Sequence, residues 1–140
     1  MSLERLNASS THTMIEALSI QFTVIGDDFL EATMPVDSRT VQPMGFLHGG
    51  ASVALAETLG SVASTLICNL ETETCFGLEI NANHIKSVRE GNVIGRVTPI
   101  HLGKSTHVWD IRIRNSRDQL LCISRLTVAV VPRKLPTVAT

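Results

Sequence analysis

The residues best suited to chemistry in this sequence lie where an irregular loop meets an apolar helix. The stretch 36–49 shows neither helical nor strand periodicity, and it leads into His48, Gly49 and Gly50. Loops of this length inside compact domains are usually functional or mobile. The first backbone amides of the following helix have no partner within the helix, and the two glycines let a ligand approach them closely. The pattern indicates a site for an anion or a polarised carbonyl, as in an oxyanion hole.

Glu57 is the second chemical feature, because it is the one carboxylate of this apolar helix. It lies about two turns beyond the helix start, with Ser61 one turn further on the same face. A buried ionised carboxylate is costly unless it has a partner, a raised pKa or access to solvent. Catalysis and a structural pairing with an Arg or His both explain such a residue, and the neighbouring loop favours catalysis. Taken singly, His48 fits a structural histidine and Ser61 a packing residue, and no base that would make a Ser–His–acid triad is evident beside Ser61.

The surrounding pattern predicts an α+β fold in which a curved antiparallel sheet wraps around one long helix. The helix is expected over 50–68, and its side chains leave so little polar face that we expect burial on nearly all sides. A shorter helix is expected within 3–18. Strands, the first two joined as a hairpin, are expected over 19–25, 30–36, 76–83, 92–102, 107–114 and 120–131.

Alternation of apolar and polar side chains predicts which strand faces meet the core. The strand at 107–114 should present Asp110, Arg112 and Arg114 to solvent. The residues expected on core faces are Leu30, Ala32, Met34 and Val36 in one strand, Phe76, Leu78, Ile80 and Ala82 in another, and Trp109, Ile111 and Ile113 in a third.

Length and composition predict one domain without nucleic-acid or membrane partners. The chain has 140 residues; we place the domain at 1–133 and expect a disordered tail at 134–140, which lacks periodicity. The formal net charge of -1 gives no electrostatic reason to expect nucleic acid. The first ten residues have no apolar stretch behind a positive start, so we expect a cytoplasmic protein. The apolar stretch 50–70 contains Glu57 and many small residues, so we expect a buried helix rather than a membrane span.

The three cysteines are odd in number and form no CxxC pair. This spacing argues against a disulfide framework and against a zinc site. We therefore expect free thiols and no metal at Cys68, Cys75 and Cys122.

Two motifs follow each other across the loop and the helix. They are Gln42-Pro-x-Gly-x-x-His48-Gly49-Gly50 and Ala56-Glu57-Thr58-x-Gly60-Ser61. Together they resemble the hotdog-fold acyl-CoA thioesterases, most closely the bacterial branch with 1,4-dihydroxy-2-naphthoyl-CoA thioesterases and the proofreading thioesterases of enterobactin synthesis. The resemblance covers about 18–131. It implies hydrolysis of an acyl-CoA to a free acid and CoA, with aryl-CoA favoured and fatty acyl-CoA as the other possible substrate.

The resemblance also implies a role for each motif residue. Glu57 would act as nucleophile or general base, and the Gly49 amide would polarise the thioester carbonyl. Gln42 would help hold that carbonyl, His48 would orient the thioester or leaving group, and Ser61 would position water or the carboxylate. A helix-end amide at a developing oxyanion can supply about 3 kcal/mol. No metal and no cofactor is implied, since CoA is part of the substrate.

An assembly and a CoA-binding surface follow from the same resemblance. The family forms homodimers whose sheets join edge to edge, usually paired again into tetramers, with each active site lined by two subunits. Gln42 and His48 would then face Glu57 of the partner subunit. The residues in turns where the family contacts the CoA nucleotide are His84, Lys86, Ser87, Arg89 and Lys104. Taken singly, each basic side chain among them is also explained as ordinary solvated surface.

Two other functions fit the same constellation. A hotdog dehydratase or hydratase also uses an acidic residue on the central helix, but its histidine precedes a proline-rich turn, whereas His48 adjoins Gly49 directly. A non-catalytic acyl-CoA-binding sensor would use the same pocket without turnover, although binding alone does not explain the ionisable Glu57 at its centre. Met44 stands where this branch often carries Phe, and its flexible thioether could reshape the acyl pocket.

Overall fold

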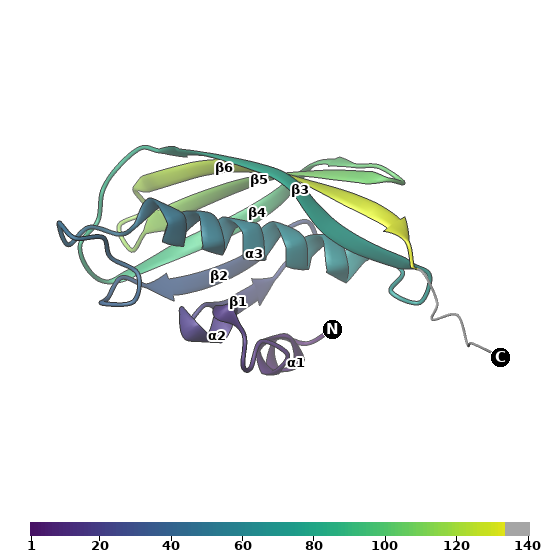
Figure 1. The fold of residues 1–140 in the computed structure, drawn as a ribbon, viewed down its shortest axis with the longest axis horizontal. Helices are drawn as coiled ribbons and strands as arrows, with labels where there is room; N and C mark the ends of the chain where they lie inside the picture. Colours follow the sequence, from purple (N-terminus) through teal and green to yellow (C-terminus); the bar gives the residue numbers. More distant parts are fainter. Residues whose placement is uncertain (134–140) are drawn as a thin grey trace.

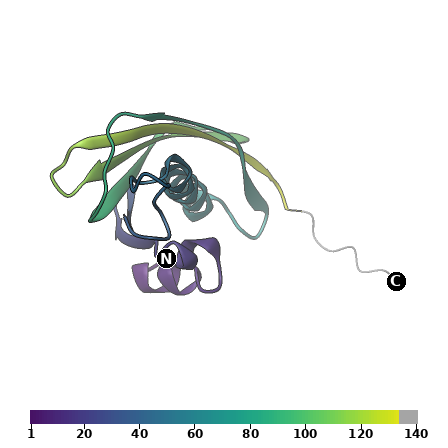
Figure 2. The ribbon, with the colours of Figure 1, turned by 60° about the vertical axis from the view of Figure 1, so that its left-hand side comes forward.

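The computed structural model describes residues 1–133, so the tail expected at 134–140 lies outside the described residues. Figures 1 and 2 show one curved sheet around a long central helix, with two short N-terminal helices on the side of that helix away from the sheet. In chain order the elements are α1 (Leu3–Ala8), α2 (Met14–Ala17), β1 (Gln21–Ile25), β2 (Leu30–Pro35), α3 (Gly49–Ile67), β3 (Glu73–His84), β4 (Asn92–Leu102), β5 (Thr106–Asn115) and β6 (Leu120–Pro132).

The strands form one antiparallel sheet in the order β1-β2-β4-β5-β6-β3. β1 and β2 make the expected hairpin, and β4, β5 and β6 follow one another as a meander. β1 and β3 are the two edges, and β3 is 12 residues long. The fold class predicted from the sequence, a hotdog fold of the α+β class, is confirmed.

The core lies between the concave face of the sheet and one face of α3. Leu55, Ala56 and Leu59 of α3 are fully buried there. The core faces predicted for β2 and β5 are confirmed, since the buried residues include Leu30, Ala32, Met34, Val36, Trp109, Ile111 and Ile113.

The expected burial of α3 on nearly all sides is wrong. Val53 and Glu57 are only half-buried, and Thr65 is exposed. The sheet covers one face of the helix, and α1 and α2 cover only part of the other (Figure 2). By length and mean hydropathy, 1.3 over its apolar window, α3 could also cross a membrane, but packing on the sheet accounts for the same apolar character.

β3 departs from the predicted alternation of side chains. Phe76 and Leu78, expected in the core, are 59% and 64% exposed, whereas Ile80 packs against the core as expected. The register with β6 shifts between Gly77 and Glu79, so Leu78 is an extra, bulged residue. One extra residue reverses the side-chain phase of a strand. The bulge thus turns Gly77, rather than its larger neighbours, toward α3.

Candidate active site

The N-terminus of α3 carries a backbone donor that no other group uses. His48 is the N-cap, and its Nδ1 accepts a hydrogen bond from the Gly50 amide at 2.8 Å. The ring hydrogen of neutral His48 therefore lies on Nε2, where it can be donated outward. The His48 carbonyl accepts from the Ala51 and Ser52 amides. Among residues 1–133 the Gly49 amide has no hydrogen-bond partner, so it remains free for a polarised carbonyl.

Gln42 occupies a tight turn ahead of this helix. Its backbone amide donates to the Phe46 carbonyl at 2.8 Å, and its carbonyl accepts from the Gly45 amide at 2.8 Å. The side-chain Oε1 accepts from the Met44 amide. Because that oxygen is occupied, the side-chain NH₂ is the group that can meet a substrate. Gln42 and Gly49 line the same cavity, of about 260 Å³.

Arg89 fastens the loop that carries Gln42 and His48. Its Nη1 donates to the Met44 carbonyl at 2.9 Å, and its guanidinium lies 3.8 Å from the centroid of the Phe46 ring. The paired hydrogen bond and cation–π contact fix the turn from outside. From the sequence, Arg89 was predicted only as a phosphate-binding residue. Its hydrogen bond to the loop was not predicted, because it joins residues 45 positions apart.

Glu57 sits between α3 and β3. Ser61 Oγ donates to Glu57 Oε1 at 3.3 Å, as the helical spacing predicted. On the other side, a Cβ added to Gly77 would lie 2.3 Å from the same oxygen, so a larger residue there would push the carboxylate out of this position. No ion pair within residues 1–133 involves Glu57. The pairing with an Arg or His that would have made Glu57 a structural residue is therefore not made within the described part of the chain.

Gly49 and Glu57 lie eight residues apart on α3, a rise of about 12 Å along the helix axis. They border different cavities, since Gly49 lines the cavity that contains Gln42, and Glu57 lines a separate one of about 300 Å³.

Three of the five CoA-contact candidates border the Gln42 cavity. His84, Lys86 and Ser87 line it. His84 is the last residue of β3 rather than part of the expected turn, because the strand extends one residue beyond its predicted end. A Cβ on Gly49 would lie 2.9 Å from His84 Nε2, so the histidine packs directly on the start of α3.

A second cavity, of about 620 Å³, gathers positive charge beside the first. Lys86 and Arg89 line it, and Arg117 joins them from the turn between β5 and β6. Arg117 was not predicted from the sequence, where a basic residue in a turn is the only signal. Lys104 lies in the turn between β4 and β5, at the other end of β4. A strand of 11 residues spans roughly 35 Å, so Lys104 does not join the group within one chain.

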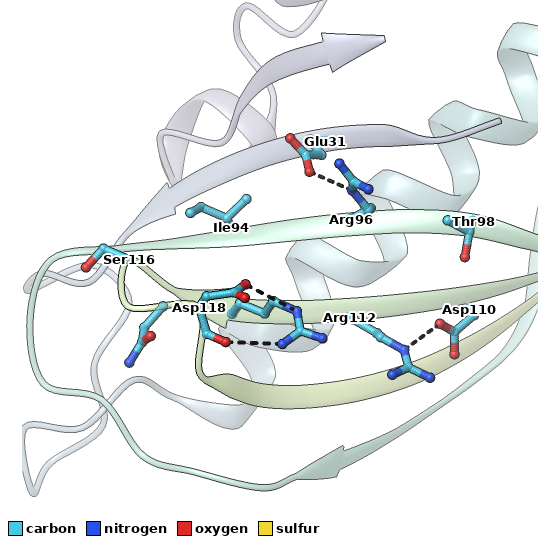
Figure 3. Close-up of a pocket in the computed structure, with 10 residues that line it drawn as sticks. Glu31, Ile94, Arg96, Thr98, Asp110, Arg112, Ser116 and Asp118 are labelled. Carbon is cyan, nitrogen blue, oxygen red and sulfur yellow. Dashed lines mark hydrogen bonds and ion pairs between the residues drawn. The ribbon is translucent and has the colours of Figure 1, made fainter. Parts of the chain in front are cut away.

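Another large cavity, also of about 620 Å³, lies on the outer face of the sheet (Figure 3). Its charged side chains pair with one another, as in Arg96 with Glu31 at 2.7 Å and Arg112 with Asp110 at 3.0 Å. Asp110, Arg112 and Arg114 line it, which confirms the polar face predicted for β5. With these charges neutralised locally, the cavity offers few groups for a substrate.

The described residues contain no cluster of three or more His, Cys, Asp and Glu side chains placed to hold a metal ion. The three cysteines are free thiols, and Cys122 is buried. Cys68, at the end of α3, touches Cys75 of β3. Burial and this contact raise the pKa of the Cys68 thiol to about 12, so Cys68 keeps its proton at neutral pH.

Comparison with known proteins identifies the family of this chain. Residues 44–122 match the family model of the thioesterase superfamily. The 1,4-dihydroxy-2-naphthoyl-CoA hydrolase of Escherichia coli is 55% identical over 131 residues, which cover 94% of this chain and 96% of that protein. The proofreading thioesterase EntH of Cronobacter turicensis is 50% identical over 131 residues, with coverage of 94% and 95%.

A solved structure shows the same fold. Thioesterase HI1161 of Haemophilus influenzae superposes with a TM-score of 0.94 at 48% sequence identity, covering 98% of this chain and 95% of that one. The free amide at Gly49 and the carboxylate of Glu57 both lie within the range that the family model matches. The chain therefore belongs to the thioesterase superfamily and is a thioester hydrolase with a hotdog fold.

Proposed function

We propose that this enzyme hydrolyses an acyl-CoA thioester to a free acid and CoA, with Glu57 as its catalytic carboxylate. The observation that carries the proposal is the place of Glu57, half-buried at a cavity wall with Ser61 as hydrogen-bond partner and without a counter-ion among residues 1–133. The relative from Escherichia coli is named for an aryl-CoA substrate, which supports an aryl-CoA here, with fatty acyl-CoA as the other candidate. A cytoplasmic setting, where CoA thioesters are made, is part of the proposal.

Each group at the site has a step to perform. Glu57 either takes a proton from water as the water attacks the thioester carbon, or attacks that carbon itself to give an anhydride that water then hydrolyses. In both routes the carbonyl oxygen gains negative charge, which the Gly49 amide stabilises, with the Gln42 NH₂ as second donor. The C–S bond breaks, and the CoA thiolate takes up the proton that Glu57 removed from water, or a proton from solvent in the anhydride route. His48 accepts from the Gly50 amide through Nδ1, so its Nε2 hydrogen is the group that would orient the leaving sulfur.

We propose that two copies of the chain assemble this site. Gly49 and Gln42 of one chain and Glu57 of another would meet on one thioester, because within one chain Gly49 and Glu57 line different cavities. The long free edge of β3, with Phe76 and Leu78 exposed, suits pairing with a second β3 across a two-fold axis. We propose a homodimer of this kind, paired again into a tetramer.

The test is thiol release from aryl-CoA and fatty acyl-CoA substrates by the wild type and by Glu57→Gln. We expect a loss of about a thousandfold or more in kcat, with the fold retained because the neutral amide is nearly isosteric. Glu71→Gln, an exposed carboxylate in the turn after α3, is the matched control and should keep full activity. A folded Glu57→Gln variant with near-normal thiol release would refute the proposed role. Binding of acyl-CoA without release by the wild type would instead indicate a sensor, and hydration of an enoyl-CoA a hydratase.

A further inference from the structure

The cavity that contains Glu57 has two walls of different origin. One wall is the outward face of α3, with Val53, Ala54 and Glu57, and the other is the N-terminal segment, with Met14, Ile15 and Leu18. The cavity holds about 300 Å³, and its lining is mostly apolar. That volume lies at the lower end of the range for small-molecule sites. The cavity therefore suits one compact apolar group placed beside a carboxylate.

The N-terminal wall is capped at the start of α2 and fastened to another segment at its end. Thr13 caps the helix by accepting from the Ile15 amide at 3.2 Å. At the other end, Arg39 Nη1 donates to Ser19 Oγ at 2.6 Å while its Nη2 pairs with Asp37 Oδ2 at 2.6 Å. Arg39 and Asp37 belong to the loop that leads to Gln42, so the wall and that loop hold each other in place. A wall fixed in this way can select a ligand by shape.

We infer that this cavity receives the acyl group of the thioester, and that Met14, Ile15 and Leu18 determine which acyl groups fit. The inference rests on the proposed function of Glu57. An acyl carbon bound to the thioester carbon must lie beside the attacking carboxylate, and this cavity is the apolar space that the carboxylate borders. The Gln42 cavity, by contrast, has a mixed lining, in which Gln42, His84 and Lys86 supply polar and basic groups that suit the CoA part of the substrate.

The two walls differ in what they carry. The α3 wall holds the catalytic carboxylate, Glu57, and lies within residues 44–122, which the family model matches. The N-terminal wall contributes only apolar side chains, Met14, Ile15 and Leu18, so a change of size there alters the acyl group accepted and leaves the carboxylate itself in place. An aromatic ring and a medium-length alkyl chain are both apolar, so both fit this lining. The substrate series below distinguishes the two kinds of acyl group.

The test compares kcat/KM for acetyl-, hexanoyl-, benzoyl- and naphthoyl-CoA in wall variants. Ile15→Trp fills the cavity and should lower kcat/KM for the large acyl groups by about tenfold or more, with acetyl-CoA changed by no more than about twofold. Met14→Trp, at a side chain that is 65% exposed, repeats the test where folding is not at risk. Ile67→Trp, at an exposed position near the other end of α3, is the matched control and should leave the series unchanged.

The outcomes separate this inference from the proposed function. If Glu57→Gln keeps its activity, the proposed function fails, whatever the wall variants do. If hydrolysis depends on Glu57 but Ile15→Trp and Met14→Trp change every acyl-CoA equally, or none, the acyl site lies elsewhere and this inference is overturned. A uniform loss with a smaller particle in size-exclusion chromatography would overturn it too, because the wall would then hold a second copy of the chain.

Discussion

The outer face of the sheet and the N-terminal half of α3 are both rich in polar groups. On the outer face these groups pair with one another, whereas around α3 key groups do not. On the outer face, Arg96 pairs with Glu31 and Arg112 with Asp110. Around α3, the Gly49 amide has no acceptor and Glu57 has no counter-ion among the described residues. Unmet hydrogen-bonding capacity near a cavity has a free-energy cost that substrate can offset. The contrast separates a solvated surface from a site.

Gly77→Ala is expected to have the largest effect on this contrast. The new methyl group would overlap Glu57 Oε1 and displace the carboxylate, which should lower kcat by about a hundredfold. Thiol-release kinetics measure the loss. In a Glu57→Gln background the same substitution should add little, because the displaced group is already inactive. Equal losses in both backgrounds would show that Gly77 acts through the fold of β3 instead.

Arg89→Leu should lower kcat by about tenfold, because it removes both contacts that hold the turn around Gln42. Arg89→Lys should not restore the rate, since an ammonium cannot both stack on Phe46 and reach the Met44 carbonyl. The comparison of acyl-CoA with the matching acyl-pantetheine decides between two roles. A positioning role predicts the same loss with both substrates, whereas a loss confined to acyl-CoA would mean that Arg89 binds its phosphates. Lys86→Ala, the control, should raise KM for acyl-CoA only.

His107 tests a polar group that is satisfied inside the core. Its Nδ1 lies 3.0 Å from Ser64 Oγ, which also accepts from Trp109 Nε1 at 2.8 Å. Burial lowers the pKa of His107 below 6.5, with His101 adding to the shift and Glu73 opposing it. The unfolded chain then binds more protons at His107 than the folded chain as the pH falls below 6.5, so the His107 contribution to the free energy of unfolding should be constant well above that pH and decrease as the pH falls. Denaturant titrations from pH 8 to 5 should show this decline, and a weaker one in His107→Gln.

Arg112→Ala should have the smallest effect. Its ion pair with Asp110 is half-exposed, so its loss should change the free energy of unfolding by no more than about 0.5 kcal/mol. The rate of thiol release should stay within about twofold of the wild type. A large loss of activity would show that the outer face contributes to the site, and the contrast between the two regions would fail.

The sequence predicted the features that depend on local patterns. The fold class, the hairpin, the core faces of β2 and β5, and the Glu57–Ser61 pair all follow from spacing along the chain. The inward turn of Gly77 did not, because one bulged residue, Leu78, shifts the period of two.

Other features depend on contacts between distant segments. The hold of Arg89 on Phe46 and the wall that Met14 forms beside Glu57 join parts of the chain far apart in sequence. The open side of α3 was missed for a related reason, since apolar composition shows that a helix needs cover but not which partner supplies it.

The most direct test of the account is complementation between two inactive variants. Glu57→Ala removes the carboxylate, and the double variant Gln42→Ala/His48→Ala removes side chains from the opposite half of the proposed site. Each alone should be nearly inactive. When the two are unfolded together and refolded as a mixture, mixed dimers contain one intact site, and roughly a quarter of the wild-type activity should return. Activity no greater than the sum of the separate variants would contradict a site shared between two copies.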